Sequence, residues 1–267
     1  MSDIINGFKI DHFIDSGYAH TTQTYEDMLT IIDQKDIPFE VAQAGQTIDF
    51  DPAVDIEVMS PGTTYSDDLN ENSVVLKITY GDTSFLLMGD AGLETEENIM
   101  KAGYDVDSDI LKVGHHGSQS GSGSTFISTV SPEVSVIEVR AENEYGHPDA
   151  EVLERLQATS KVYRTDLNGT ITVTTDGSTY TVTTQKSDTP YVSPNTTPTE
   201  TSEVIPTETS TSEPAKVQVT APDSKKSDIT DTSSASNSLY ISDLMSVLLI
   251  KQQIKNMLKL QIKEQHQ

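Results

Sequence analysis

The sequence predicts an α/β domain, with helices layered on a mixed sheet, over residues 1–186. Two observations carry this prediction. Short runs rich in Val, Ile, Leu and Phe alternate with segments of helical periodicity, which is the pattern of consecutive βαβ units. Two of these runs adjoin across Gly81-Asp82, which predicts an antiparallel hairpin in the same sheet. We therefore expect parallel and antiparallel strands together.

The individual elements follow from local patterns. Helices are predicted from apolar residues at helical spacing and from capping residues at the ends, and they span about 22–34, 93–101, 126–130 and 148–159. Strands are predicted from β-branched and aromatic residues, and they span about 8–14, 39–42, 54–59, 73–80, 83–88, 110–113, 134–139, 162–165, 170–175 and 178–184. Asp176-Gly177 is the predicted two-residue turn between the last two strands.

Composition divides the chain into three regions. Residues 1–186 form the domain, and residues 187–238 are rich in Ser, Thr, Pro and Glu, which predicts a disordered linker or stalk. Residues 239–267 return to helical periodicity, with lysines every four residues at 251, 255, 259 and 263. A basic amphipathic helix can lie on an anionic membrane, bind a partner or fold back on the acidic domain; a tail without function is the remaining alternative.

Charge and composition limit the functions open to the chain. The formal net charge is −25, so a nucleic-acid substrate would need bound cations or a local basic patch. The chain has no cysteine, which excludes disulfides and thiolate metal sites. We predict neither a signal peptide nor a membrane-spanning helix, because the start lacks a basic segment and no long apolar run follows. The compartment is left open.

Three motifs that could carry chemistry follow predicted strands or precede a helix. An apolar strand ends in Gly-Asp, and the carboxylate of Asp90 could there bridge two cations. The next strand ends in Gly-His-His-Gly-Ser, and because neighbouring side chains of an extended segment diverge, only one of His115 and His116 should face a given metal. In Gly-His-Pro, His147 precedes a helix start, which is a place for anions. Each motif alone also has an ordinary explanation as a hydrogen-bonded loop.

The ordered set of motifs resembles the C-terminal half of the ComEC-type competence branch of the metallo-β-lactamase superfamily. The match covers residues 8 to about 185, and it includes the stretches 15–18, 72–76, 162–166 and 168–171. The resemblance implies a four-layer αββα fold with a two-metal site, usually zinc. It also implies a metal-dependent hydrolase of phosphodiesterase or nuclease type, acting on a phosphoester or on DNA. In ComEC-type proteins this domain is thought to act at the cell envelope.

The resemblance also assigns roles by position. Asp90 is expected to be the bridging metal ligand and His115 the late metal-binding histidine. His116 and His147 are expected to be catalytic groups beside the substrate. The weaker candidates for the substrate-binding rim are His20, Asp15 and Ser118. The alternative for His20 is a surface loop residue before a helix.

The chain departs from the family in its first metal-binding motif. No His-x-His-x-Asp-His run is present, and Asp11-His12 falls inside a predicted strand. We therefore expect the chain to begin after this motif, with only two of the three or four ligands that zinc needs. A catalytically incomplete remnant or binding module is the alternative function. Missing strands are also expected to expose apolar sheet surface, with marginal stability or self-association as the result.

Overall fold

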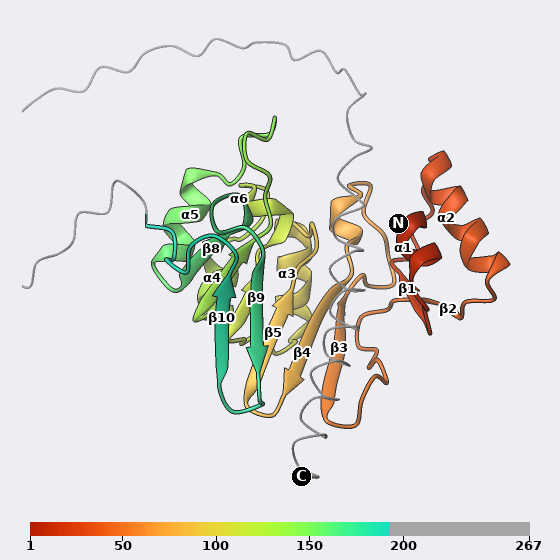
Figure 1. Cartoon of the computed structure of the whole chain (residues 1–267), viewed down its shortest axis with the longest axis horizontal. Helices are drawn as coiled ribbons and strands as arrows, with labels where there is room; N and C mark the ends of the chain where they lie inside the picture. Colours follow the sequence, from red (N-terminus) through yellow and green to blue (C-terminus); the bar gives the residue numbers. More distant parts are fainter. Residues whose placement is uncertain (193–267) are drawn as a thin grey trace, which may run out of the picture.

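The centre of the molecule is a six-stranded mixed sheet in the order β3-β4-β5-β6-β7-β8 (Figure 1). This computed structural model describes residues 1–192. The strands of the sheet are β3 (Val54–Ser60), β4 (Val75–Tyr80), β5 (Thr83–Leu87), β6 (Ile110–Lys112), β7 (Val134–Ile137) and β8 (Lys161–Arg164). The first three run antiparallel and the last four run parallel, so β5 belongs to both halves. The predicted mixed α/β class and the hairpin between β4 and β5 are confirmed.

Helices cover one face of this sheet. They are α3 (Leu93–Ala102), α4 (Ser124–Val130) and α5 (Ala150–Gln157). Their apolar sides and the facing strand residues form the main core, in which Phe126, Leu111 and Leu156 are each 1% exposed or less. α3 ends at Gly103 in a left-handed conformation, as the sequence predicts. α5 begins two residues after Pro148, because Asp149 is its N-terminal capping residue.

A hairpin covers part of the other face. It consists of β9 (Ile171–Thr175) and β10 (Tyr180–Thr184), and it packs on side chains of β5 to β8. α6 (Thr165–Asn168) leads into it. The turn is centred on Gly177-Ser178, one residue later than predicted. The reason is that Asp176 flanks the turn: its N–H donates to the carbonyl of Thr179, and its Oδ1 accepts the N–H of Ser178 at 2.9 Å.

The N-terminal residues form a small unit beside the β3 edge of the sheet (Figure 1). It contains α1 (Ser2–Gly7), β1 (Phe13–Asp15), α2 (Gln23–Gln34) and β2 (Phe39–Val41). The expected strand over 8–14 is wrong for its first residues, and α1 precedes it. Ile5 is fully buried in a separate cluster with Met28 and Ile32 of α2, and this packing favours a helix at the start of the chain.

Several expectations extend beyond the described part. From residue 193 on, the predicted linker 187–238 and the helical segment 239–267 lie outside the described residues. Within residues 1–192 there is one large sheet and two two-stranded ones, so a four-layer αββα arrangement stays a prediction. No helix of this part is long and apolar enough to cross a membrane.

Candidate functional site

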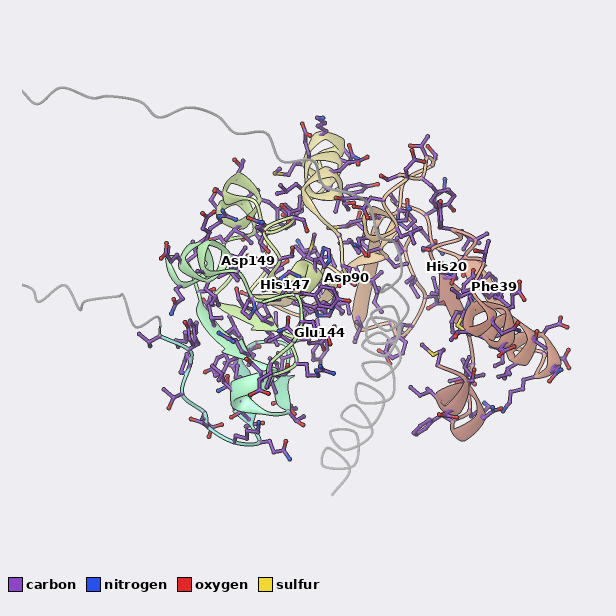
Figure 2. All side chains as sticks on the ribbon, turned by 90° about the horizontal axis from the view of Figure 1, so that it is seen from above. His20, Phe39, Asp90, Glu144, His147 and Asp149 are labelled. Carbon is purple, nitrogen blue, oxygen red and sulfur yellow. The ribbon has the colours of Figure 1, made fainter. Side chains whose placement is uncertain are left out.

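Three parallel strands bring the motifs together at one edge of the sheet. Asp90 follows β5, the 3₁₀ turn η2 (Gly114–Gly117) follows β6, and Glu138 follows β7. The carboxyl ends of parallel strands are where α/β proteins place their reactive groups. Figure 2 shows Asp90, His147 and Asp149 grouped in this region. The structure thus assembles side chains that are far apart in the sequence.

The two adjacent histidines lie in a strained turn and not in an extended segment. His115 and His116 have φ values of 46° and 54°, in the left-handed region that non-glycine residues rarely adopt. The N–H of His115 donates to the carbonyl of Gly89 at 3.1 Å, and the N–H of Ser118 donates to the carbonyl of His115 at 2.9 Å. Such conformations cost of order 1–3 kcal/mol each and cluster at functional sites.

His116 faces Asp90. Its Nε2 lies 3.3 Å from Oδ1 of Asp90, and the two side chains are only 11% and 5% exposed. Its Nδ1 lies 2.6 Å from the carbonyl oxygen of Glu138. Because a carbonyl only accepts, Nδ1 carries the proton of that bond, and Nε2 is the nitrogen turned to the carboxylate.

The pair has the chemistry of metal ligands but does not complete a site. Imidazole nitrogen and carboxylate oxygen are zinc donors, and a backbone carbonyl on the other ring nitrogen is the usual support for a ligand histidine. Two zinc ligands at about 2.0–2.1 Å and a tetrahedral angle stand about 3.3 Å apart, close to the distance between these atoms. Among residues 1–192, however, no group of three or more His, Cys, Asp or Glu is placed to hold a metal.

His115 turns toward His147. The two rings are 5.8 Å apart, and Nδ1 of His115 contacts Oγ of Ser120 at 2.9 Å. Nδ1 of His147 lies 3.3 Å from Oδ2 of Asp149, and the ring stacks on Tyr145 at 5.9 Å. The expectation of His115 at the metal and His116 at the substrate stays a prediction, but the geometry pairs His116 with Asp90.

The turn of the two histidines is joined to the loop that carries His147. Oδ2 of Asp149 accepts the N–H of Gln119 at 3.0 Å, and the N–H of Asp149 donates to the carbonyl of Gly117 at 2.9 Å. Gly117 has φ +80°, and a Cβ on it would stand 2.6 Å from Cβ of Pro148. A glycine is therefore required for this close approach. Ser118 is buried, and its Oγ accepts a hydrogen bond from Ser120 at 3.0 Å.

A lysine beneath the site was missed from the sequence. Lys112 of β6 has an 8% exposed side chain whose Nζ donates to the carbonyl of Gly89 at 3.1 Å and lies 3.8 Å from Oε2 of Glu138. It brings a positive charge next to Asp90. The signal was a charged residue inside the apolar run 110–113. No comparable sequence pattern points to Asp149 or Glu138 as residues of the site.

Ser118 lies at the turn of the two histidines, but the other two weaker rim candidates, Asp15 and His20, lie elsewhere. Oδ1 of Asp15 accepts the N–H of Gly17 at 2.7 Å and the hydroxyl of Tyr25 at 3.2 Å, and burial raises the pKa of this carboxyl. His20 contacts Oγ1 of Thr22 at 3.0 Å. Figure 2 shows His20 on the N-terminal unit, apart from Asp90 and His147. The structure therefore does not bring His20 to the other site residues.

Comparison with known proteins relates the chain to competence proteins. Over 115 residues it is 40% identical to the ComE operon protein 3 of Bacillus subtilis (strain 168), and over 120 residues it is 37% identical to the competence protein ComA of Neisseria gonorrhoeae. It is also 31% identical, over 118 residues, to the recombination protein 2 of Haemophilus influenzae.

These matches cover 43–44% of the chain but only 15–17% of the relatives. No family model matches the chain. Distant homology over about 118 residues therefore relates this chain to the ComEC, ComA and Rec2 competence proteins.

Proposed function

We propose that this chain carries part of a metal-dependent hydrolase site of the metallo-β-lactamase type, with phosphodiesterase or nuclease chemistry in a competence-related process. The observation that carries the proposal is the buried pair of Asp90 and His116, 3.3 Å apart at the carboxyl ends of parallel strands. The relation to competence proteins supports it. Asp90 and His116 are the proposed metal donors.

The remaining histidines are proposed to contact the substrate. His115 and His147 stand side by side next to the Asp90 pair, and their N–H groups can donate to the oxygens of a phosphoester. Asp149 orients His147 through its carboxylate. The expected cofactor is a divalent metal, usually zinc in the superfamily that the chain resembles. When bound, it would activate water and stabilise the oxygens of a phosphoester.

The two donors need completion by ligands that residues 1–192 do not supply. A zinc site takes three or four protein ligands, and the described residues offer no group of three. We propose the αββα arrangement for the domain, with a second sheet on the face of β3 to β5 opposite the helices. Because residues 1–192 contain no group of three potential metal ligands, a binding module without catalysis is the second candidate function.

Metal binding by the full chain separates the two functions. We would measure zinc and manganese content by elemental analysis, then zinc affinity by calorimetry, for the wild type, Asp90→Asn and His116→Gln. The matched control is His12→Gln, because His12 lies 3.1 Å from Glu40 in a similar histidine–carboxylate contact outside the site. We expect at least a tenfold loss of zinc affinity in the first two variants and none in the control.

Two results would contradict the proposal. Equal zinc affinity in all four proteins would show that Asp90 and His116 are not the donors. Absence of zinc binding by the wild type would favour the binding module. Hydrolysis of a model phosphodiester by the zinc-loaded chain, lost in Asp90→Asn, would establish the chemistry.

A further inference from the structure

Lys112 ends the middle one of the three parallel strands that carry the site. It is the last residue of β6 in both of its ladders, where it pairs with Leu87 of β5 and with Val136 of β7. Gly89 and Glu138 each lie two residues beyond these partners, about 6–7 Å farther along the strand direction. The ladders that join β5, β6 and β7 therefore end before they reach Gly89 and Glu138.

The ammonium group of Lys112 reaches both of these residues. Its Nζ donates to the carbonyl of Gly89 at 3.1 Å and lies 3.8 Å from Oε2 of Glu138. Each of the two residues is coupled to one member of the buried pair. Gly89 directly precedes Asp90 in the chain, and the carbonyl oxygen of Glu138 accepts the hydrogen bond of His116 Nδ1 at 2.6 Å. One ammonium group thus connects to Asp90 on one side and to His116 on the other.

The stability of the sheet does not by itself explain a lysine at this position. The side chain is only 8% exposed, and a buried ammonium group costs free energy unless it is paired and hydrogen-bonded. Apolar side chains of similar volume in place of a buried ion pair are often neutral or stabilising. Methionine at position 112 would fill the same space in β6 without this cost. A role in arranging the site accounts for the charge.

We propose that Lys112 is a positioning residue, which fixes Asp90 and His116 relative to each other by holding Gly89 and Glu138. It acts through these two residues and not directly on a bound metal or substrate. Because the carboxylate of Glu138 balances the ammonium group, the two together add little net charge beside Asp90. The effect on metal binding rests on the proposed function, whereas the effect on His116 in the metal-free chain does not.

The hydrogen bond of His116 gives a readout in the metal-free full chain. We would measure by nitrogen-15 NMR the rate at which its Nδ1 proton exchanges with water, in the wild type, Lys112→Met and Lys77→Met. Lys77 of β4 is the matched control, because its 12% exposed side chain contacts the carboxylate of Asp105 at 2.8 Å and its carbonyl at 3.1 Å, outside the site. We expect exchange to be at least tenfold faster in Lys112→Met and unchanged in Lys77→Met.

Two outcomes of this experiment would overturn the proposal. Exchange that is unchanged in both variants would show that Lys112 does not hold the contact of His116. Exchange that rises equally in both would show that the loss of any buried ion pair of the sheet has this effect. The double variant Lys112→Met/Glu138→Gln should exchange as fast as Lys112→Met. It leaves no unpaired buried carboxylate, so it remains testable where the single variant does not fold.

Zinc affinity measures the effect on metal binding. The double variant keeps the net charge of the chain, so a change in its affinity reports the arrangement of the donors. We expect its zinc affinity to fall about 10–100-fold, as for other residues that support metal ligands, and that of Lys77→Met to stay unchanged. Unchanged affinity in the double variant would overturn the proposal. If the wild type binds no zinc, the proposed function fails, and exchange of the Nδ1 proton still decides the role of Lys112.

Discussion

Replacing Gly117 by alanine should destabilise the protein through two separable effects. The backbone there has φ +80°, and this left-handed conformation costs a residue with a Cβ about 1–2 kcal/mol. The new Cβ would also stand 2.6 Å from Cβ of Pro148, so the loop must move, as in an overpacked core where about 1–3 kcal/mol is lost. Together we expect the free energy of unfolding to fall by about 2–5 kcal/mol.

Gly103→Ala is the matched control. Gly103 has φ +78°, and a Cβ on it would meet nothing within 4 Å, so this variant carries the backbone effect without the contact. Urea unfolding followed by far-ultraviolet circular dichroism would give both values, since the chain has no tryptophan to report. If Gly117→Ala loses no more than Gly103→Ala, the turn of the two histidines is not held against Pro148, and our account of the site geometry fails.

Three further variants test other parts of the fold. Burial raises the pKa of Glu96 from 4.5 to about 7, so the folded state binds more protons than the unfolded state between these values. The free energy of unfolding should therefore fall by up to ~3 kcal/mol as the pH rises through this range. Urea titrations at pH 5 and 8 should show this fall in the wild type and not in Glu96→Gln. Phe126→Ala empties a side chain that is 1% exposed and should cost about 3–5 kcal/mol, seen as a lower urea midpoint, and a loss below 1 kcal/mol would contradict the packing. Arg164→Lys loses one of two N–H donors to Asp166 and should lower the thermal midpoint by a few degrees; an unchanged midpoint would show that the paired geometry contributes nothing.

Much of the sheet could be predicted because its strands carry local signals. The runs that became β4 and β5 are apolar, β-branched and separated by Gly81-Asp82, and the structure pairs Tyr80 with Thr83 as a tight hairpin. α1 could not be predicted, because its stability comes from Ile5 packing against α2 and not from its own six residues. The sequence predicts the last turn one residue too early, because Asp176 is a residue type common at turn centres but here flanks the turn and accepts the N–H of Ser178.

The sequence predicts which residues belong to the site better than it predicts how their side chains are arranged. Asp90, His115, His116 and His147 do come together, because each follows a strand or precedes a helix at the same edge. Which side chain each histidine contacts depends on the backbone angles of the turn, and these could not be predicted from the sequence. The left-handed turn sets His116 against Asp90, where an extended segment would have let either histidine take that place.

The division of the sheet into an antiparallel and a parallel half has a consequence for folding kinetics. β3, β4 and β5 are consecutive antiparallel neighbours, and β4 and β5 meet across a tight turn, so their pairing closes short loops. In the parallel half, Phe85 pairs with Ile110, Ile110 with Val134, and Val134 with Lys161, so each pairing closes a loop of about 25 residues. We expect the antiparallel half to form first. Asp90, His116 and His147 would then gain their mutual positions only in the last cooperative step, and mutations around them should speed unfolding more than they slow folding.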